Sequence, residues 1–187
     1  VIPPHPSFMP GVEALCRKNG ILLIADEVIT AFGRTGAWTG SRLWGVKPDF
    51  ACTAKAITNA YFPFGAVMIG ESVAEVFEND TTGRAAIGHG YTYSGHPVGA
   101  AAALACLAET QRLNVKDNAA ARGAELFAGL QALQAKHEAI GDVRGGYGLM
   151  LALEMVADRA TKKPADKAAP ATVQSVAYKA GTMVRVS

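Results

Sequence analysis

The chain has 187 residues, of which 50% are hydrophobic and 18% are charged, and its formal net charge at pH 7 is +2. This composition is typical of a globular protein, and the nearly neutral charge gives no electrostatic support for nucleic-acid binding. No apolar run approaches the roughly 20 residues that span a bilayer, so we expect no membrane segment. The three cysteines (Cys16, Cys52 and Cys106) are widely spaced in apolar surroundings, which predicts reduced thiols in a cytoplasmic protein.

Helical and strand-like segments alternate at the start of the chain. Residues 10–19 have a helical pattern that Gly20 ends. The continuous apolar run at residues 21–25 predicts a strand that is buried on both faces, as in a parallel sheet. Residues 31–45 are rich in glycine and aromatic residues and predict an ordered loop.

Two more strands and a short helix are expected next. Residues 50–53 predict a strand that leads to Lys55, and residues 65–70 predict another. Ser72 is expected to cap a short helix that ends at Phe77.

Helices dominate the following segment. The alanine-rich residues 97–112 predict a largely buried helix, and Asp117 is expected to cap a second helix that ends near His137. Residues 142–145 and 149–156 then predict a hairpin-like pair of strands.

The last part of the chain predicts a solvated loop at residues 158–167, a helix at residues 170–180 and a strand at residues 183–186. That strand would stop at Ser187 without a partner, and the chain begins at Val1 without methionine. We therefore expect a fragment of a longer protein, inactive by itself because part of the active site is missing.

This order of elements predicts an α/β fold with a mostly parallel sheet. Residues 1–137 are assigned to the carboxyl-terminal part of a large domain and its following helices, and residues 138–187 to an incomplete, smaller α+β domain.

Three features together suggest a cofactor site. Asp26 ends a predicted strand, where ligands of open α/β sheets bind, and its carboxylate can stabilise a protonated ring nitrogen. Lys55 follows a strand between small and apolar residues, a setting that favours the neutral amine needed for a Schiff base. The hydroxyl-rich residues 90–97 run into a helix and suit a phosphate group. Each feature alone is usually structural, but the combination points to pyridoxal phosphate.

Residues 21–36, Lys55 and residues 91–97 closely resemble the class III aminotransferases, which are fold-type I pyridoxal-phosphate enzymes. The resemblance covers essentially the whole chain, including residues 142–145 and 148–150. It implies the large domain of that fold, a pyridoxal 5'-phosphate cofactor, and exchange of an amino group between an amine donor and a keto-acid acceptor.

The resemblance also implies residue roles. Asp26 would bind the pyridine nitrogen, and Val28 would pack on the ring face. Lys55 would form the Schiff base with the cofactor and then move the proton between the substrate Cα and the cofactor C4′. Thr92, with the backbone of Tyr91 and Thr92, would reach the phosphate of the neighbouring subunit, so a homodimer would complete each active site.

One departure from many relatives suggests a subgroup. Ile29 stands where acetylornithine and 4-aminobutyrate aminotransferases carry glutamine, and this isoleucine resembles the ω-amine:pyruvate branch, as do residues 92–97. The expected reaction transfers an amino group from an amine or ω-amino acid to pyruvate. Other class III members, including aminomutases, remain alternatives.

Rival interpretations explain fewer of these residues. Residues 21–27 resemble a Walker B strand of an ATPase, but the chain has no phosphate-binding loop of the Walker A pattern. A serine-hydrolase elbow around Ser94 would need glycine at Thr92. His89 and His96 lack metal-site spacing, so no metal site is predicted. An inactive relative that keeps the fold is a further alternative.

Overall fold

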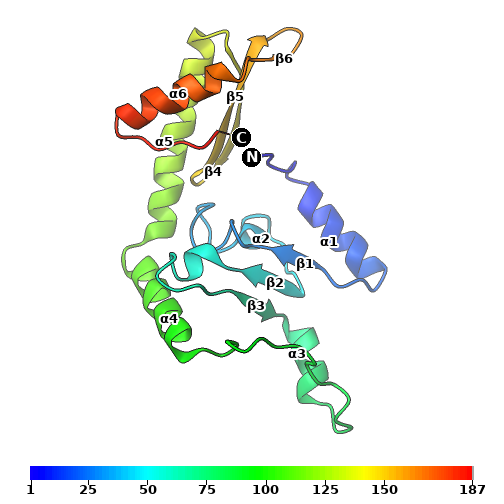
Figure 1. The fold of residues 1–187 in the computed structure, drawn as a ribbon. Helices are drawn as coiled ribbons and strands as arrows, with labels where there is room; N and C mark the ends of the chain where they lie inside the picture. The colour runs from blue at the N-terminus through cyan, green and yellow to red at the C-terminus, as the bar shows by residue number, and fades with distance from the viewer. Residues whose placement is uncertain (187) are drawn as a thin grey trace. The chain divides into compact units, whose positions relative to one another are not determined.

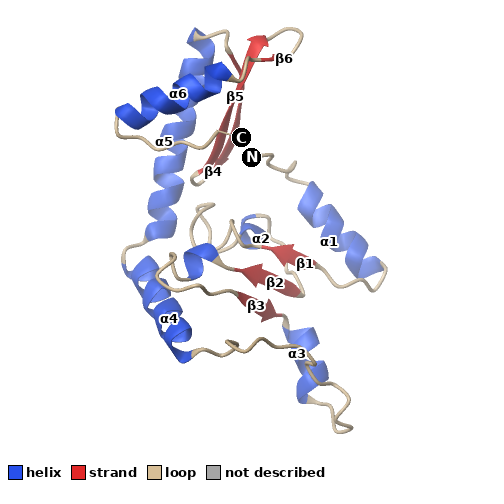
Figure 2. Ribbon diagram, in the orientation of Figure 1, coloured by secondary structure: helices blue, strands red, loops and turns tan. Residues whose placement is uncertain are grey.

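The computed structural model describes residues 1–186 of the chain (Figure 1). The chain forms two compact units: one is Pro4–Arg122, and the other runs from Gly123 onward and includes Val1–Pro3. Both units combine helices with a small sheet, so the predicted α/β class is confirmed (Figure 2). Among residues 1–186, no helix is long and apolar enough to cross a membrane.

The sheet of the first unit has the order β1-β2-β3, with β1 at Ile24–Asp26, β2 at Phe50–Thr53 and β3 at Ala66–Ile69 (Figure 2). β1 and β2 are parallel, as predicted, whereas β3 runs antiparallel to β2. The chain turns back after β2 through the short 3-10 helix η1 (Lys55–Ile57) and the loop that follows it, without the α-helix that usually connects parallel strands.

The helices of this unit begin earlier than predicted in three cases. Their bounds are Phe8–Lys18 for α1, Gly40–Leu43 for α2, Glu71–Glu78 for α3 and Pro97–Arg112 for α4, and the long helix α5 follows at Val115–Lys136. Ser72 is not the cap of α3, because the backbone N–H of Gly70 is bound to Asp49 O and the helix begins directly afterwards. Asp117 likewise lies inside the first turn of α5, where its charge complements the helix dipole.

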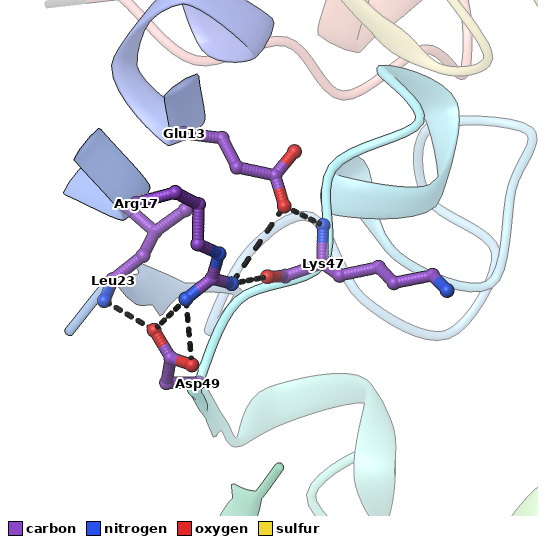
Figure 3. A network of polar contacts seen from close by, with 5 residues as sticks. All are labelled: Glu13, Arg17, Leu23, Lys47 and Asp49. Atoms are coloured by element: carbon purple, nitrogen blue, oxygen red, sulfur yellow. Dashed lines mark hydrogen bonds and ion pairs between the residues drawn. The ribbon is translucent and has the colours of Figure 1, made fainter. Parts of the chain in front are cut away.

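A polar network ties α1 to the first two strands (Figure 3). Arg17 Nη1 donates to both carboxylate oxygens of Asp49, to Oδ1 at 2.8 Å and to Oδ2 at 2.7 Å. Leu23 N donates to Asp49 Oδ2 at 2.7 Å. Arg17 Nη2 donates to Lys47 O, and Lys47 N donates to Glu13 Oε1. Asp49 is only 4% exposed. This buried carboxylate therefore holds together the residues that directly precede β1 and β2.

The pH dependence of stability should report on Asp49. The N–H of Leu23 and the guanidinium of Arg17 lower the pKa of Asp49 below its usual 3.8, against the opposing effect of burial. A lowered pKa contributes stability above the unfolded-state value that is lost as the pH falls through the lower folded-state value. We therefore expect the urea concentration at the unfolding midpoint to decrease as the pH is lowered from about 5 to about 3. The decrease should be smaller in Asp49→Asn. An equal acid dependence in both proteins would contradict this role.

The burial expected for the first strand is not observed among residues 1–186. Leu23 is buried, but Ile24 is 64% exposed and Val67 on β3 is 58% exposed. The reason is that the described helices of this unit leave these strand residues without a covering layer.

The second unit contains a β-hairpin and a final helix. β4 (Ile140–Tyr147) pairs antiparallel with β5 (Met150–Asp158), which also pairs with the short β6 (Lys163–Pro164), and α6 covers Ala168–Lys179. The hairpin prediction is confirmed with longer strands. β6 lies in the segment predicted as a loop, and residues 183–186 form no strand. Gln174 Nε2 instead donates to Val184 O, which holds this segment to α6.

Helix α5 and the β4–β5 turn approach each other too closely for a side chain at Gly123. A Cβ there would lie 1.9 Å from Gly148 O. We expect Gly123→Ala to destabilise the unit by about 1–3 kcal/mol, because forced overpacking outweighs the gain of about 1 kcal/mol in helix propensity. Gly129→Ala is the matched control on the same helix, since its Cβ meets nothing within 4 Å. Thermal unfolding should show opposite shifts, and equal stabilisation of both variants would refute the close approach.

Candidate active site

Asp26 is the last residue of β1 and lies opposite Cys52 in the parallel register of β1 and β2. Its side chain is exposed, and its Oδ1 accepts a hydrogen bond of 3.1 Å from the N–H of Val28. The carboxylate therefore lies at the carboxyl end of the strand, where the sequence predicted a ligand-binding acid.

Lys55 begins η1 directly after β2 and adopts a left-handed backbone with φ of 48°. Its side chain is exposed and has no hydrogen-bond or ion-pair partner among residues 1–186, while Ala54 and Ala56 are half-buried. The apolar enclosure expected around this amine is thus not formed by the described residues. Because β1 and β2 are adjacent and parallel, Asp26 and Lys55 lie at the same edge of the sheet.

Glu27 is the acid that sequence reasoning left without a role. It is 2% exposed, and its carboxylate accepts hydrogen bonds from Gly40 N (2.8 Å), Ser41 N (2.6 Å) and the hydroxyls of Ser41 and Thr30. Burial alone would raise the pKa of Glu27, but the bonds from Ser41, Thr30 and Gly40 together lower it below the usual 4.5. The residue is therefore a buried carboxylate anion that closes the loop after β1.

Val28 is half-buried and follows Glu27 in this loop, and Ile29 is 53% exposed. Both thus lie within a few residues of Asp26, at the same end of β1. Their positions are compatible with contact to a ligand at this edge.

Tyr91 and Thr92 lie in the exposed segment before α4. Tyr91 N donates to Ser94 Oγ and Ser94 N donates to Tyr91 O, both at 2.9 Å, so the segment forms a hydrogen-bonded turn. Tyr91 itself is 75% exposed. Among residues 1–186, no hydrogen bond or ion pair joins this turn to Asp26 or Lys55.

The start of α4 is nevertheless anchored beside the chain that follows η1. His96 caps the helix by accepting a hydrogen bond from Val98 N, and its ring lies 5.1 Å from that of Phe62. A Cβ on Gly99 would lie 2.6 Å from the ring of Phe64, so glycine permits this packing. The structure thus places the start of α4 beside Phe62 and Phe64, in the segment that follows η1.

A hollow of about 630 Å³ in the same unit lies between the loop with Phe32 and Trp38 and the end of β3 at Met68 and Ile69. Neither Asp26 nor Lys55 lines it. The candidate site is therefore at the exposed carboxyl ends of β1 and β2, not in this hollow.

The side chains present fit pyridoxal phosphate. An exposed carboxylate at one strand end suits the basic ring nitrogen, and an exposed, unpaired amine at the next strand end suits the aldehyde.

Comparison with known proteins supports the same chemistry. Residues 1–186 match the family described as aminotransferase class-III. The chain is 44% identical over 166 residues to a diaminobutyrate–2-oxoglutarate transaminase of Halomonas elongata, covering 89% of this chain and 35% of that protein. It is 36% identical over 189 residues to the mitochondrial gamma-aminobutyrate transaminase 1 of Oryza sativa subsp. indica, covering 100% of this chain and 36% of that protein. The chain thus spans about a third of the length of these relatives.

The solved structures that this chain resembles include transaminases. A PLP-bound amine transaminase from an uncultivated Pseudomonas species is 46% identical, with a TM-score of 0.91 over 99% of this chain and 42% of that one. An (S)-enantioselective omega-transaminase from Thermomicrobium roseum is 40% identical, with a TM-score of 0.87 over 100% of this chain and 41% of that one. These matches favour the cofactor-site interpretation over the Walker B interpretation of residues 21–27.

Proposed function

Because the chain belongs to the class III aminotransferase family, we propose that it acts within a transaminase that moves an amino group from an amine or ω-amino acid to a keto acid. The observation that carries the proposal is the parallel register of β1 and β2. That register brings an exposed carboxylate, Asp26, and an exposed amine, Lys55, to one edge of the sheet.

Each of the three site residues has a separate role in the proposed reaction. Asp26 would bind the pyridine nitrogen of pyridoxal phosphate and keep it protonated, and Val28 would pack on the ring. Lys55 would hold the cofactor through its aldehyde, with release of water, and its amine would later carry the proton between the substrate Cα and the cofactor C4′. The bound cofactor supplies an electron-withdrawing ring that stabilises negative charge at the Cα.

The turn at Tyr91 and Thr92 is proposed to serve a second copy of the protein. The Thr92 amide and hydroxyl suit the cofactor phosphate of the neighbouring subunit, while the Tyr91 N–H is bound to Ser94 Oγ and shapes the turn. The exposure of Tyr91 is in keeping with a partner-facing role. The protein would therefore act as a homodimer with shared sites. We place it in the cytoplasm from its cysteine usage, although some relatives are mitochondrial.

Pyruvate is the proposed acceptor. Support comes from Ile29 and residues 92–97, and from the ω-transaminases among the similar structures. The diaminobutyrate–2-oxoglutarate transaminase among the relatives favours 2-oxoglutarate as the second candidate acceptor.

An absorbance spectrum of the full-length protein that carries this chain tests the proposal. With pyridoxal phosphate added, we expect the band of a lysine-linked cofactor, its loss on addition of an amine donor, and its return with pyruvate. Return with 2-oxoglutarate alone would retain the transaminase and change the acceptor. Failure to form any band would overturn the proposed function.

A further inference from the structure

The buried carboxylate of Glu27 has no part in the proposed chemistry. A carboxylate offers about four acceptor positions, and the two oxygens of Glu27 take hydrogen bonds from Gly40 N, Ser41 N and two hydroxyls. With these positions filled and the side chain 2% exposed, Glu27 has no lone pair left for a substrate proton or a metal. Its contribution must come from what it holds in place.

The side chain ties the end of β1 to the start of α2. One oxygen binds the N–H and hydroxyl of Ser41, and the other binds Gly40 N and the hydroxyl of Thr30. A Cβ on Gly40 would lie 3.2 Å from Oε2 of Glu27, so the small residue permits the approach. The loop between β1 and α2 is thereby closed on a single carboxylate.

The main chain of Glu27 is fixed as well. Its N–H donates to Cys52 O at 2.8 Å on β2, and its carbonyl accepts from Ala31 N at 3.0 Å. Asp26 precedes it and Val28 follows it, and the N–H of Val28 binds Asp26 Oδ1. The direction of the Asp26 carboxylate therefore depends on the peptide that Glu27 fixes.

We propose that Glu27 is a positioning residue, which orients Asp26 and Val28 for the pyridine ring of the cofactor through its bonds to Thr30, Gly40 and Ser41. The inference rests on the proposed function and deepens it.

The test compares Glu27→Gln with Asp49→Asn in the full-length protein. Glutamine has nearly the same side-chain shape as glutamate, but its NH2 group would face hydrogen-bond donors that need an acceptor. The loop would therefore lose some of the hydrogen bonds that close it. Asp49 is also buried and hydrogen-bonded, but it anchors α1 and the residues just before β1 and β2, at the opposite end of these strands from Asp26. The measurements are the unfolding midpoint, the affinity of the apoprotein for pyridoxal phosphate, and the pH profile of the bound cofactor's absorbance.

We expect Glu27→Gln to weaken cofactor binding by about tenfold or more, because misplacement of a binding group by a fraction of an ångström is costly. The absorbance profile should also shift, since ring-nitrogen protonation depends on Asp26. Asp49→Asn should lower only the unfolding midpoint. Equal affinity losses in the two variants would show a merely structural role and overturn the inference.

Ser41→Ala provides a milder variant should Glu27→Gln fail to fold. It removes one hydroxyl donor and keeps the Ser41 N–H, so we expect a smaller affinity loss in the same direction and the same sign of absorbance shift. Wild-type affinity and profile in Ser41→Ala and in a folded Glu27→Gln would overturn the inference while leaving the proposed function intact. A wild-type protein that binds no cofactor would overturn both.

Discussion

Replacing Lys55 with alanine is expected to abolish turnover in the full-length protein and to leave its fold intact. The side chain is exposed and unpaired among residues 1–186, so its removal costs no described contact. Both its bond to the cofactor and its proton transfer would be lost, and the rate should fall by about 10³-fold or more. Steady-state kinetics measure the loss, and circular dichroism checks the fold.

Lys18→Ala is the matched control for this experiment. Lys18 is an exposed lysine in the last turn of α1, in the same compact unit. We expect it to retain wild-type kinetics and the absorbance band that Lys55→Ala loses. Substantial turnover in Lys55→Ala would remove this residue from the mechanism.

Asp26→Ala is expected to slow proton removal by roughly 10³-fold, the size of effect seen when a single electrostatic stabiliser is deleted. Without the carboxylate the ring nitrogen would lose the partner proposed to keep it protonated, and cofactor affinity should fall too. Pre-steady-state absorbance after mixing with an amine donor measures the step.

Asp26→Asn separates charge from shape. Asparagine can still accept the hydrogen bond from Val28 N, so the local backbone should be preserved. If charge is what matters, the two variants should be similarly slow. Activity within tenfold of wild type in both would identify a different partner for the ring nitrogen.

Local patterns in the sequence were sufficient for most elements of the fold. Phe50–Thr53 and Pro97–Arg112 have the predicted bounds, and for the helix a proline start with a long alanine run is a strong local signal. The direction of β3 was not part of the prediction, since strand direction depends on how the chain returns after Lys55. Ser72 failed as a cap because a distant contact, from Gly70 N to Asp49 O, decides where α3 begins.

The candidate site was predictable where its residues follow strands and unpredictable where it depends on distant partners. The ends of two predicted strands gave Asp26 and Lys55. Glu27 stood beside Asp26 with no local signal of its own, because its partners Gly40 and Ser41 are far along the chain. The exposure of Lys55 was also missed, since flanking alanines do not determine which way a side chain faces.

The three-stranded sheet has a consequence for handling this polypeptide by itself. Among residues 1–186, β2 is the central strand, and the outer edges of β1 and β3 have no neighbour. Open edges beside apolar side chains, such as the 64% exposed Ile24, are templates on which a second chain can add strands. Made in isolation at high concentration, the polypeptide would therefore tend toward intermolecular β-aggregation.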